Sequence, residues 1–244
     1  RANNFRVLFK ERRWGDGSST PISGPGSTLQ RTVGIRAALP SLFARWDDDP
    51  FRVERCRYNI RSLWDAGCGD MTWMASVNLT GIRCVVSLVG PDDGSYVGTD
   101  IVEDLVESHR DQFRDRTDVT FETEDLVVTA ASRSVDLILC RDALMHLPHR
   151  DVMKTLRGFS RSGSRYLLTT SFALSSVGRE NTDLLPGEFT PLDLTSSPFH
   201  LHEPLEWVDE ALPEDKGSTH NDAIKRLGLW RLPVIQDTED HDEL

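Results

Sequence analysis

The chain has 244 residues, of which 39 are acidic and 28 are basic, so its formal net charge is -11 at pH 7. This excess of negative charge opposes a broad phosphate-binding surface and argues against nucleic acid as a partner. No apolar run approaches the roughly 18 to 20 residues that a membrane span needs, and the length fits one α/β domain with appendages.

The first 59 residues predict a loop followed by a helical cap. Glycine, serine and proline are frequent in residues 1–30, and residues 23–28 are typical of a turn that leads into a helix N-cap. Apolar residues then recur at a loose helical spacing from Leu29 onward, and this helix is expected to end near Pro40. The acidic residues 46–50 indicate a loop.

From residue 60, short apolar segments alternate with amphipathic ones, which is typical of a mostly parallel sheet with helices on both faces. Helices are predicted to begin near Asp70 and Val102, and a further helix is predicted at residues 149–160. The predicted strands cover residues 60–65, 96–100, 119–122, 135–140, 165–171 and 226–232. This pattern predicts a Rossmann-like α/β domain over residues 60–236.

The segment at residues 172–212 is too long for an ordinary connection, and proline and serine interrupt it repeatedly. Segments of this kind are often binding loops. We therefore expect residues 172–212 to form a lid that orders over the substrate, with Phe189 and Phe199 as its aromatic edges. Residues 237–244 are expected to be a mobile acidic tail.

A glycine-containing loop follows the first predicted strand. Glycines allow positive φ and close approach of the backbone, so a strand-to-helix turn of this kind suits a nucleotide-type ligand. The loop predicts a cofactor site made by Asp65, Gly67, Cys68, Gly69 and Asp70.

Acidic residues also follow the second and third predicted strands. Asp100 is placed to accept hydrogen bonds from the two hydroxyls of a ribose, and Asp125 from an adenine amino group. Each residue alone could equally be a turn or cap carboxylate. Because acidic residues close three successive strands, the pattern favours a binding role.

Several motifs resemble those of known methyltransferases. Residues 65–70, 98–101 and 140–142, which include Ile101 and Arg141, resemble the first, second and fourth motifs of class I S-adenosylmethionine-dependent methyltransferases. A narrower pattern over nearly the whole chain resembles a group of small bacterial-type methyltransferases, with residues 89–95 as an insertion. The matching segments are residues 23–29, 68–74, 141–148 and 227–230. The resemblance implies a seven-stranded sheet and S-adenosylmethionine as cofactor.

Methyl transfer is an in-line displacement, so the protein mainly positions the acceptor and, for a hydroxyl, removes its proton. The turn after the fourth strand faces the methyl group in this fold. Asp142 is therefore the first candidate base, and His146, one helical turn further on, is the second. His146 could instead pack or cap a helix, and Arg141 could be an electrostatic clamp or part of an ion pair.

Other residues are candidates for binding the acceptor or the amino-acid end of the cofactor. Ser27 and Arg36 suit the cofactor, although an N-cap serine and a surface arginine are the plainer interpretations. Tryptophans could form a platform for a sugar ring or a flat acceptor, or they could belong to the core. The three candidates are Trp14, Trp73 and Trp230.

The four cysteines form no Cys-x-x-Cys pair, so no zinc site is predicted. Acidic residues around Asp142 and at residues 181–183 could hold magnesium, but their spacing is not diagnostic, so no metal ligand is assigned. The last residues, His241, Asp242, Glu243 and Leu244, match a retention signal of the endoplasmic reticulum if the natural chain ends there and has a leader. The lumen of that compartment is the expected location, with the cytoplasm as the alternative.

Together these observations predict O-methylation of a hydroxyl on a glycan or small metabolite. The alternatives are N-methylation of a protein or small amine, and a catalytically silent subunit that binds the cofactor. The oligomeric state does not follow from the sequence.

Overall fold

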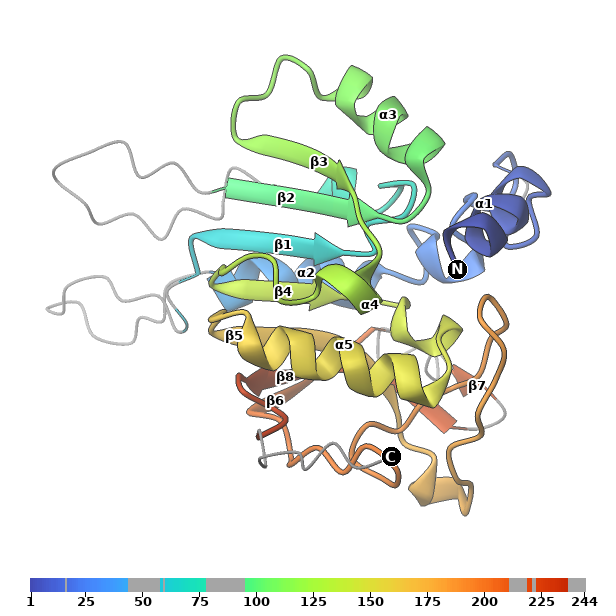
Figure 1. Ribbon diagram of the computed structural model, residues 1–244, viewed down its shortest axis with the longest axis vertical. Coiled ribbons are helices and arrows are strands. Elements are labelled where there is room, and N and C mark those ends of the chain that lie inside the picture. The colour runs from blue at the N-terminus through green and yellow to red at the C-terminus, as the bar shows by residue number, and fades with distance from the viewer. Residues whose placement is uncertain are drawn as a thin grey trace, which may run out of the picture.

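The computed structural model describes residues 1–15, 17–43, 58, 60–77, 95–210, 219–220 and 223–236. Within these ranges, seven strands lie side by side in the order β3, β2, β1, β4, β5, β8, β6, and the two-residue β7 (Thr219–His220) pairs with β8 (Figure 1). In that order the seven strands span Val119–Thr123, Ser95–Asp100, Ser62–Ala66, Leu137–Cys140, Tyr166–Phe172, Ala223–Arg231 and Glu206–Asp209.

Strands β1 to β5 pair in parallel, and β8 pairs antiparallel with both β5 and β6. The predicted Rossmann-like fold with a mostly parallel seven-stranded sheet is therefore confirmed. Because the parallel strands all run in one direction, their carboxyl ends meet at a single edge of the sheet. The register places Asp65 of β1 opposite Gly98 of β2 and Leu139 of β4.

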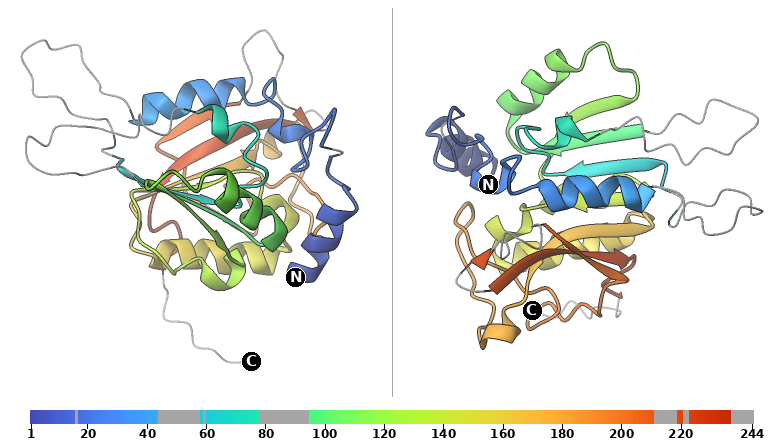
Figure 2. Two further views of the ribbon diagram at one scale, coloured as in Figure 1. Left: turned by 90° about the horizontal axis from the view of Figure 1, so that it is seen from above. Right: turned by 180° about the vertical axis from the view of Figure 1, so that it is seen from behind.

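Each face of the sheet has its own apolar core, and successive residues of a strand alternate between the two cores. Leu63 of β1 and Leu139 of β4 pack on the face covered by α2 (Val33–Phe43). Their neighbours Trp64 and Cys140 pack on the opposite face. Figure 2 shows α2 and α5 (His149–Arg161) on opposite sides of the sheet.

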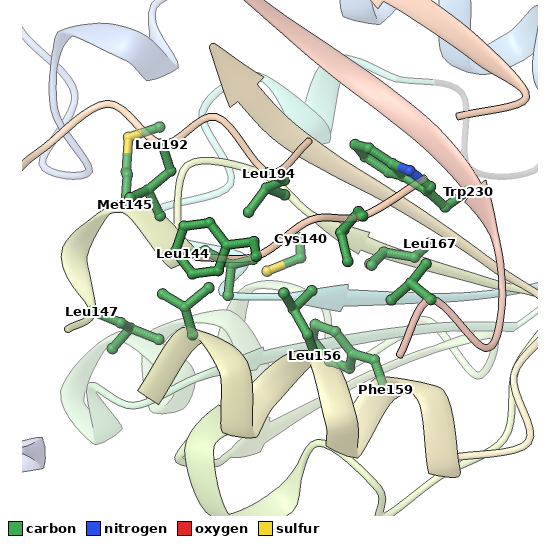
Figure 3. Packing of buried hydrophobic residues seen from close by; sticks show 14 of the residues in the cluster. Cys140, Leu144, Met145, Leu147, Leu156, Phe159, Leu167, Leu192, Leu194 and Trp230 are labelled. Atoms are coloured by element: carbon green, nitrogen blue, oxygen red, sulfur yellow. The ribbon is translucent and has the colours of Figure 1, made fainter. Parts of the chain in front are cut away.

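Helix α5 packs through one stripe of its surface. Val152, Leu156 and Phe159 recur at helical spacing and are fully buried against the sheet, with Leu156 and Phe159 seen below Cys140 in Figure 3. Two further helices, α3 (Glu103–Gln112) and α4 (Leu126–Thr129), follow β2 and β3. No helix in the described part of the chain is long and apolar enough to cross a membrane.

The helical cap differs from its predicted bounds at both ends. A short 3-10 helix covers Pro25–Ser27, and α2 begins only at Val33. The helix then continues through Pro40 to Phe43. Ile35, Leu39 and Leu42 are buried against the sheet, while Pro40 is exposed, so tertiary packing keeps the helix intact across the proline.

Helix α1 (Ala2–Lys10) was not predicted, because residues 1–30 were interpreted together as one loop. The glycine and proline residues of this region all lie after the helix. None of its residues is buried. Arg6 and Lys10 form ion pairs with Asp104 of α3, at 3.0 and 3.2 Å. The helix lies beyond the carboxyl ends of the parallel strands, where Figure 1 shows it.

The helix predicted near Asp70 is also different. Thr72 donates a backbone hydrogen bond to the Asp70 side chain, and Met71 has a φ of 58°, so the chain turns instead of entering an α-helix. A 3-10 helix at Met74–Ser76 follows, and residues 78–94, with most of the predicted insertion, lie outside the described residues.

Part of the segment predicted as a lid belongs to the core. Leu192, Leu194 and Phe199 are buried, and β6 belongs to the same segment. Phe199 packs against His149 at 5.1 Å between ring centroids and is therefore no edge of a lid. Phe189 remains 44% exposed, so ordering over substrate stays a prediction for the part of the segment around it.

Candidate active site

The glycine loop after β1 requires its glycines. Gly67 and Gly69 have φ values of 91° and 59°, in the left-handed region. A Cβ on Gly67 would lie 2.9 Å from the Cβ of Ala143, and one on Gly69 would lie 2.5 Å from the Ser23 hydroxyl. The loop thus packs closely against Ala143 and Ser23, and a side chain at either glycine would disturb this packing.

Asp65 supports this loop from below. Its side chain is buried and accepts a 2.8 Å hydrogen bond from the hydroxyl of Tyr96. Burial raises the pKa of Asp65 to about 7, against the opposing effects of the Tyr96 hydrogen bond and the charge of Arg141. The next cysteine, Cys68, is also buried, and burial raises the pKa of its thiol well above its ordinary value, so the thiol is uncharged.

Asp100 joins the end of β2 to the glycine loop. One carboxylate oxygen accepts from the backbone N–H of Gly69 at 3.1 Å and the other from that of Val102 at 3.0 Å. Burial raises the pKa of Asp100, and these backbone hydrogen bonds partly offset the rise. The carboxylate is therefore fixed beside Gly69, where the sequence predicted a ribose-binding group.

Asp125 follows β3 and has two partners. Its side chain caps α4 by accepting from the backbone N–H of Val127 at 3.1 Å, and it pairs with Arg1 at 2.9 Å. One carboxylate oxygen of Asp125 therefore acts as a helix cap, as one of the two sequence interpretations predicted. The predicted contact with adenine would have to compete with Arg1.

The turn that precedes α2 is hydrogen-bonded to the glycine loop. Ser23 and Asp70 bond reciprocally, since the backbone N–H of Asp70 donates to the Ser23 hydroxyl at 2.6 Å and that of Ser23 donates to the Asp70 carboxylate at 3.0 Å. Asp70 is therefore a structural residue of the loop. Ser27 is buried and lines the cavity described below, but Arg36 donates to the carbonyl of Leu29 and does not line it.

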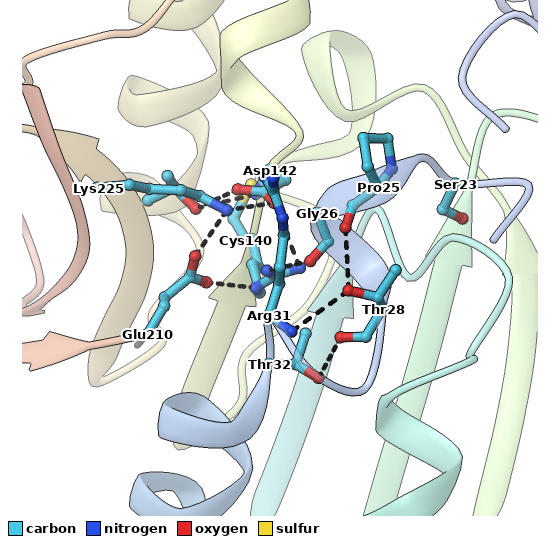
Figure 4. A network of polar contacts seen from close by, with 12 residues as sticks. Ser23, Pro25, Gly26, Thr28, Arg31, Thr32, Cys140, Asp142, Glu210 and Lys225 are labelled. Carbon is cyan, nitrogen blue, oxygen red and sulfur yellow. Dashed lines mark hydrogen bonds and ion pairs between the residues drawn. The ribbon is translucent and has the colours of Figure 1, made fainter. Parts of the chain in front are cut away.

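Four charged side chains form a buried network next to the loop after β4 (Figure 4). Lys225 lies 2.6 Å from Asp142 and 2.6 Å from Glu210, and Arg141 pairs with Glu210 and donates to the carbonyl of Gly26 at 2.8 Å. The side chains of Arg141, Lys225 and Glu210 are 3%, 7% and 0% exposed. Arg141 is thus an ion-pair partner.

Sequence reasoning missed Glu210 and Lys225. One signal for Lys225 was present, because β8 alternates and Lys225 has the same parity as the apolar Leu227 and Leu229. A lysine on the apolar side of a strand needs a buried partner. Glu210, which follows β6 inside the segment interpreted as a lid, gave no such signal.

Asp142 is a poor candidate for the general base. Its backbone has a φ of 56°, and Thr170 donates to its carboxylate at 3.0 Å. Burial alone raises the pKa of Asp142, but the charges of Arg141 and Lys225 outweigh burial and keep the pKa well below its ordinary value. A carboxylate held as an anion this firmly is a weak proton acceptor, so the structure argues against the first-ranked prediction.

His146 is better placed for proton transfer. Its Nδ1 lies 2.8 Å from the carbonyl oxygen of Glu188. A carbonyl only accepts, so Nδ1 is the donor and Nε2 of the neutral ring has the free lone pair. Burial lowers the pKa of His146, which keeps the ring neutral and able to accept a proton.

The three predicted tryptophans have different surroundings. Trp14 lies 5.7 Å from His146 between ring centroids, and Trp73 lies under the guanidinium of Arg141 at 5.2 Å. Trp230 is fully buried and donates to the carbonyl of His202 at 2.7 Å, far from the cavity lining. The prediction of Trp230 as a substrate residue is therefore wrong, because β8 turns that side chain into the core.

One cavity brings most of the predicted residues together. Arg36, Asp70 and Trp230 are the candidate site residues that do not line it. Those that do are Trp14, Ser27, Asp65, Gly67, Cys68, Gly69, Trp73, Asp100, Ile101, Asp125, Arg141, Asp142 and His146. Phe5 and Phe9 of α1 also line the cavity, which the sequence did not indicate.

Residues 64–167 match the family described as methyltransferase domain. The chain also resembles the N-methyltransferase NodS of Bradyrhizobium japonicum in complex with S-adenosyl-L-homocysteine, with a TM-score of 0.57, 12% identity, and 94% of this chain and 99% of that one covered. It resembles magnesium protoporphyrin IX methyltransferase of Synechocystis with bound S-adenosylmethionine, with a TM-score of 0.55, 14% identity, and 95% and 96% covered. No curated protein matches the chain.

Proposed function

We propose that the chain is an S-adenosylmethionine-dependent methyltransferase that methylates a hydroxyl group with His146 as the base. The match of residues 64–167 to the methyltransferase domain family and the fold that the chain shares with two methyltransferases support this proposal. The observation that supports this most strongly is the hydrogen bond from Nδ1 of His146 to the Glu188 carbonyl, which leaves Nε2 as a proton acceptor at the cavity.

The described residues fit the cofactor. Gly67, Gly69 and Asp100 all line the cavity, and the Asp100 carboxylate is fixed beside Gly69 by its hydrogen bond from the Gly69 N–H. Gly67, Gly69 and Asp100 would hold the nucleoside, and Ser27 would contact the amino-acid end. When bound, the cofactor supplies an electrophilic methyl group on a sulfonium.

The other residues of the site position groups and keep charges balanced. The buried network has two cations, Arg141 and Lys225, and two anions, Asp142 and Glu210, so it is neutral overall. The network holds the loop after β4 in place. The hydrogen bond from Arg141 to the Gly26 carbonyl also connects it to the turn before α2, which is hydrogen-bonded to the glycine loop through Ser23 and Asp70. His146 follows in the same loop and takes its position from this arrangement.

N-methylation is the second candidate, because the chain has the fold of an N-methyltransferase over nearly its whole length. A neutral amine already has a free lone pair, so it would not need the proton-accepting Nε2 of His146. A catalytically silent subunit would bind the cofactor and transfer nothing. The glycan acceptor and the lumenal location stay predictions, and residues 241–244 lie outside the described residues.

The test measures transfer of a labelled methyl group to a panel of hydroxyl and amine compounds, with the methylated atom located by mass spectrometry. His146→Ala is expected to lower turnover by about 10² to 10⁴-fold on the hydroxyl acceptor and to leave the affinity for S-adenosylhomocysteine nearly unchanged. The control is His202→Ala, since His202 is exposed and does not line the cavity. Label found only on nitrogen, or full activity of His146→Ala, would contradict the proposal.

A further inference from the structure

Four rings are successive neighbours, and three of them, Phe5, Trp14 and His146, line the cavity. Phe5 and Trp14 lie 5.8 Å apart between ring centroids, Trp14 and His146 lie 5.7 Å apart, and His146 and Phe189 lie 5.9 Å apart. The interplanar angles of 47°, 48° and 54° are tilted arrangements of the kind aromatic groups favour.

This row, which we call the aromatic wall, is assembled from segments distant in sequence. Phe5 belongs to α1, Trp14 to the loop after it, His146 to the 3-10 helix Leu144–His146, and Phe189 to the segment before β6. Phe5, Trp14 and His146 line the cavity together with Phe9. The ring of His146, which the proposed function uses as a base, therefore has an aromatic neighbour in both Trp14 and Phe189.

Charged groups near the aromatic wall are already paired. Arg141, Asp142, Lys225 and Glu210 satisfy one another in the buried network. A sugar acceptor presents several hydroxyls, and each needs a polar partner when it is buried. A flat aromatic acceptor needs ring contacts and a single polar partner, which matches the aromatic wall and His146.

We propose that the methyl acceptor is a planar aromatic compound with a hydroxyl on its ring, and that it stacks against the aromatic wall with this hydroxyl at Nε2 of His146. This inference rests on the proposed O-methylation and narrows its substrate class. A free glycan or an aliphatic alcohol is the excluded alternative.

The acidity of the hydroxyl also favours an aromatic acceptor over an aliphatic one. A phenol loses its proton with a pKa of about 10, as tyrosine does, whereas an aliphatic hydroxyl is closer to the value of about 15.7 for water. His146, whose pKa burial lowers, is a weak base and matches the more acidic group. In the transfer, the phenolic oxygen forms the bond to the methyl carbon, the carbon–sulfur bond breaks with its electron pair on sulfur, and the phenolic proton moves to Nε2 and then to solvent.

The experiment compares 1-naphthol with its fully saturated counterpart, decahydro-1-naphthol, and with 1-aminonaphthalene. Binding to the protein loaded with S-adenosylhomocysteine is measured by calorimetry, and methyl transfer is measured separately with labelled cofactor. We expect 1-naphthol to bind about tenfold more tightly than the saturated alcohol and to accept the label on oxygen. Trp14→Leu should weaken 1-naphthol binding by about two- to tenfold and leave affinity for S-adenosylhomocysteine unchanged.

Two further variants separate stacking from a loss of structure. Trp14→Phe keeps a ring in place and should retain most of the 1-naphthol affinity. Trp207→Phe, at a tryptophan that packs on Trp230 away from the cavity lining, should change neither affinity. Equal binding of the two alcohols, or full 1-naphthol affinity in Trp14→Leu, overturns the inference whatever the transfer assay shows. Transfer to the saturated alcohol would leave O-methylation standing, whereas label found only on the nitrogen of 1-aminonaphthalene would overturn O-methylation itself.

Discussion

Replacing Lys225 with methionine tests the buried charge network. The side chain keeps its length but loses its charge, so Asp142 and Glu210 each lose a cation 2.6 Å away. Removing one partner of a buried ion pair costs about 3 to 5 kcal/mol. Asp142 is 20% exposed and retains Arg141 at 3.3 Å, and Glu210 also retains Arg141, so we expect the lower end, about 3 kcal/mol.

The effect of Lys225→Met should depend on pH with a defined sign. The folded-state pKa of Asp142 is held below its unfolded value of about 3.9, so its pairing stabilises the fold fully above about pH 4. This stabilisation is lost as the pH falls through the folded pKa. Without Lys225 the folded-state pKa of Asp142 is higher than in wild type. The difference in unfolding free energy between wild type and Lys225→Met should therefore be largest near pH 7 and become smaller as the pH falls.

The assay is urea unfolding of both proteins between pH 3 and pH 7, with the free energy of unfolding obtained by linear extrapolation. Lys154→Met is the matched control, because Lys154 is exposed on α5 and should change stability by no more than about 0.5 kcal/mol. The double variant with Asp142→Asn should recover part of the loss, since it removes one of the two unpaired anions. A loss below about 1 kcal/mol, or a difference that does not shrink in acid, would refute the reasoning.

Three more predictions concern the cavity and the core. Asp100→Ala should weaken S-adenosylhomocysteine binding by about 1.5 to 3 kcal/mol in calorimetry if two ribose hydrogen bonds are lost, and unchanged affinity in a folded variant would remove the assignment. Turnover on a hydroxyl acceptor should rise with pH through a midpoint below about 6.5, because His146 acts as the neutral base and burial lowers its pKa; a rate profile with the same limb in His146→Ala would exclude this origin. Trp230→Ala should cost about 3 to 5 kcal/mol of unfolding free energy, whereas Trp14→Ala should mainly weaken acceptor binding, and the reverse pattern would contradict the placement of these two side chains.

The sequence by itself determined most of the sheet and the glycine loop after β1. Apolar strand segments and their spacing predicted β1 to β5 and β8 within about three residues at their ends, because the period of two and the buried faces are local properties. The sequence also predicted the functions of Gly67 and Gly69 in the turn and of Asp100 at the end of β2. A positive φ and the end of a strand each restrict which residue type a position accepts.

Only the tertiary structure decided which of these residues meet and what each carboxylate does. The sequence favoured Asp142 over His146 as the base, but the pairing of Asp142 with Lys225, 83 positions away, makes Asp142 the weaker proton acceptor. Lys225 also pairs with Glu210, and this ion pair allows the Glu210 side chain, inside an apparent loop, to be fully buried. The surroundings of Trp14 and Trp230 likewise depend on packing. The register of β8 places the Trp230 side chain in the core, whereas Trp14, in the loop after α1, packs against His146. A sequence pattern specifies local geometry, but pKa, burial and partner choice depend on contacts between distant segments, and these are fixed when the chain folds.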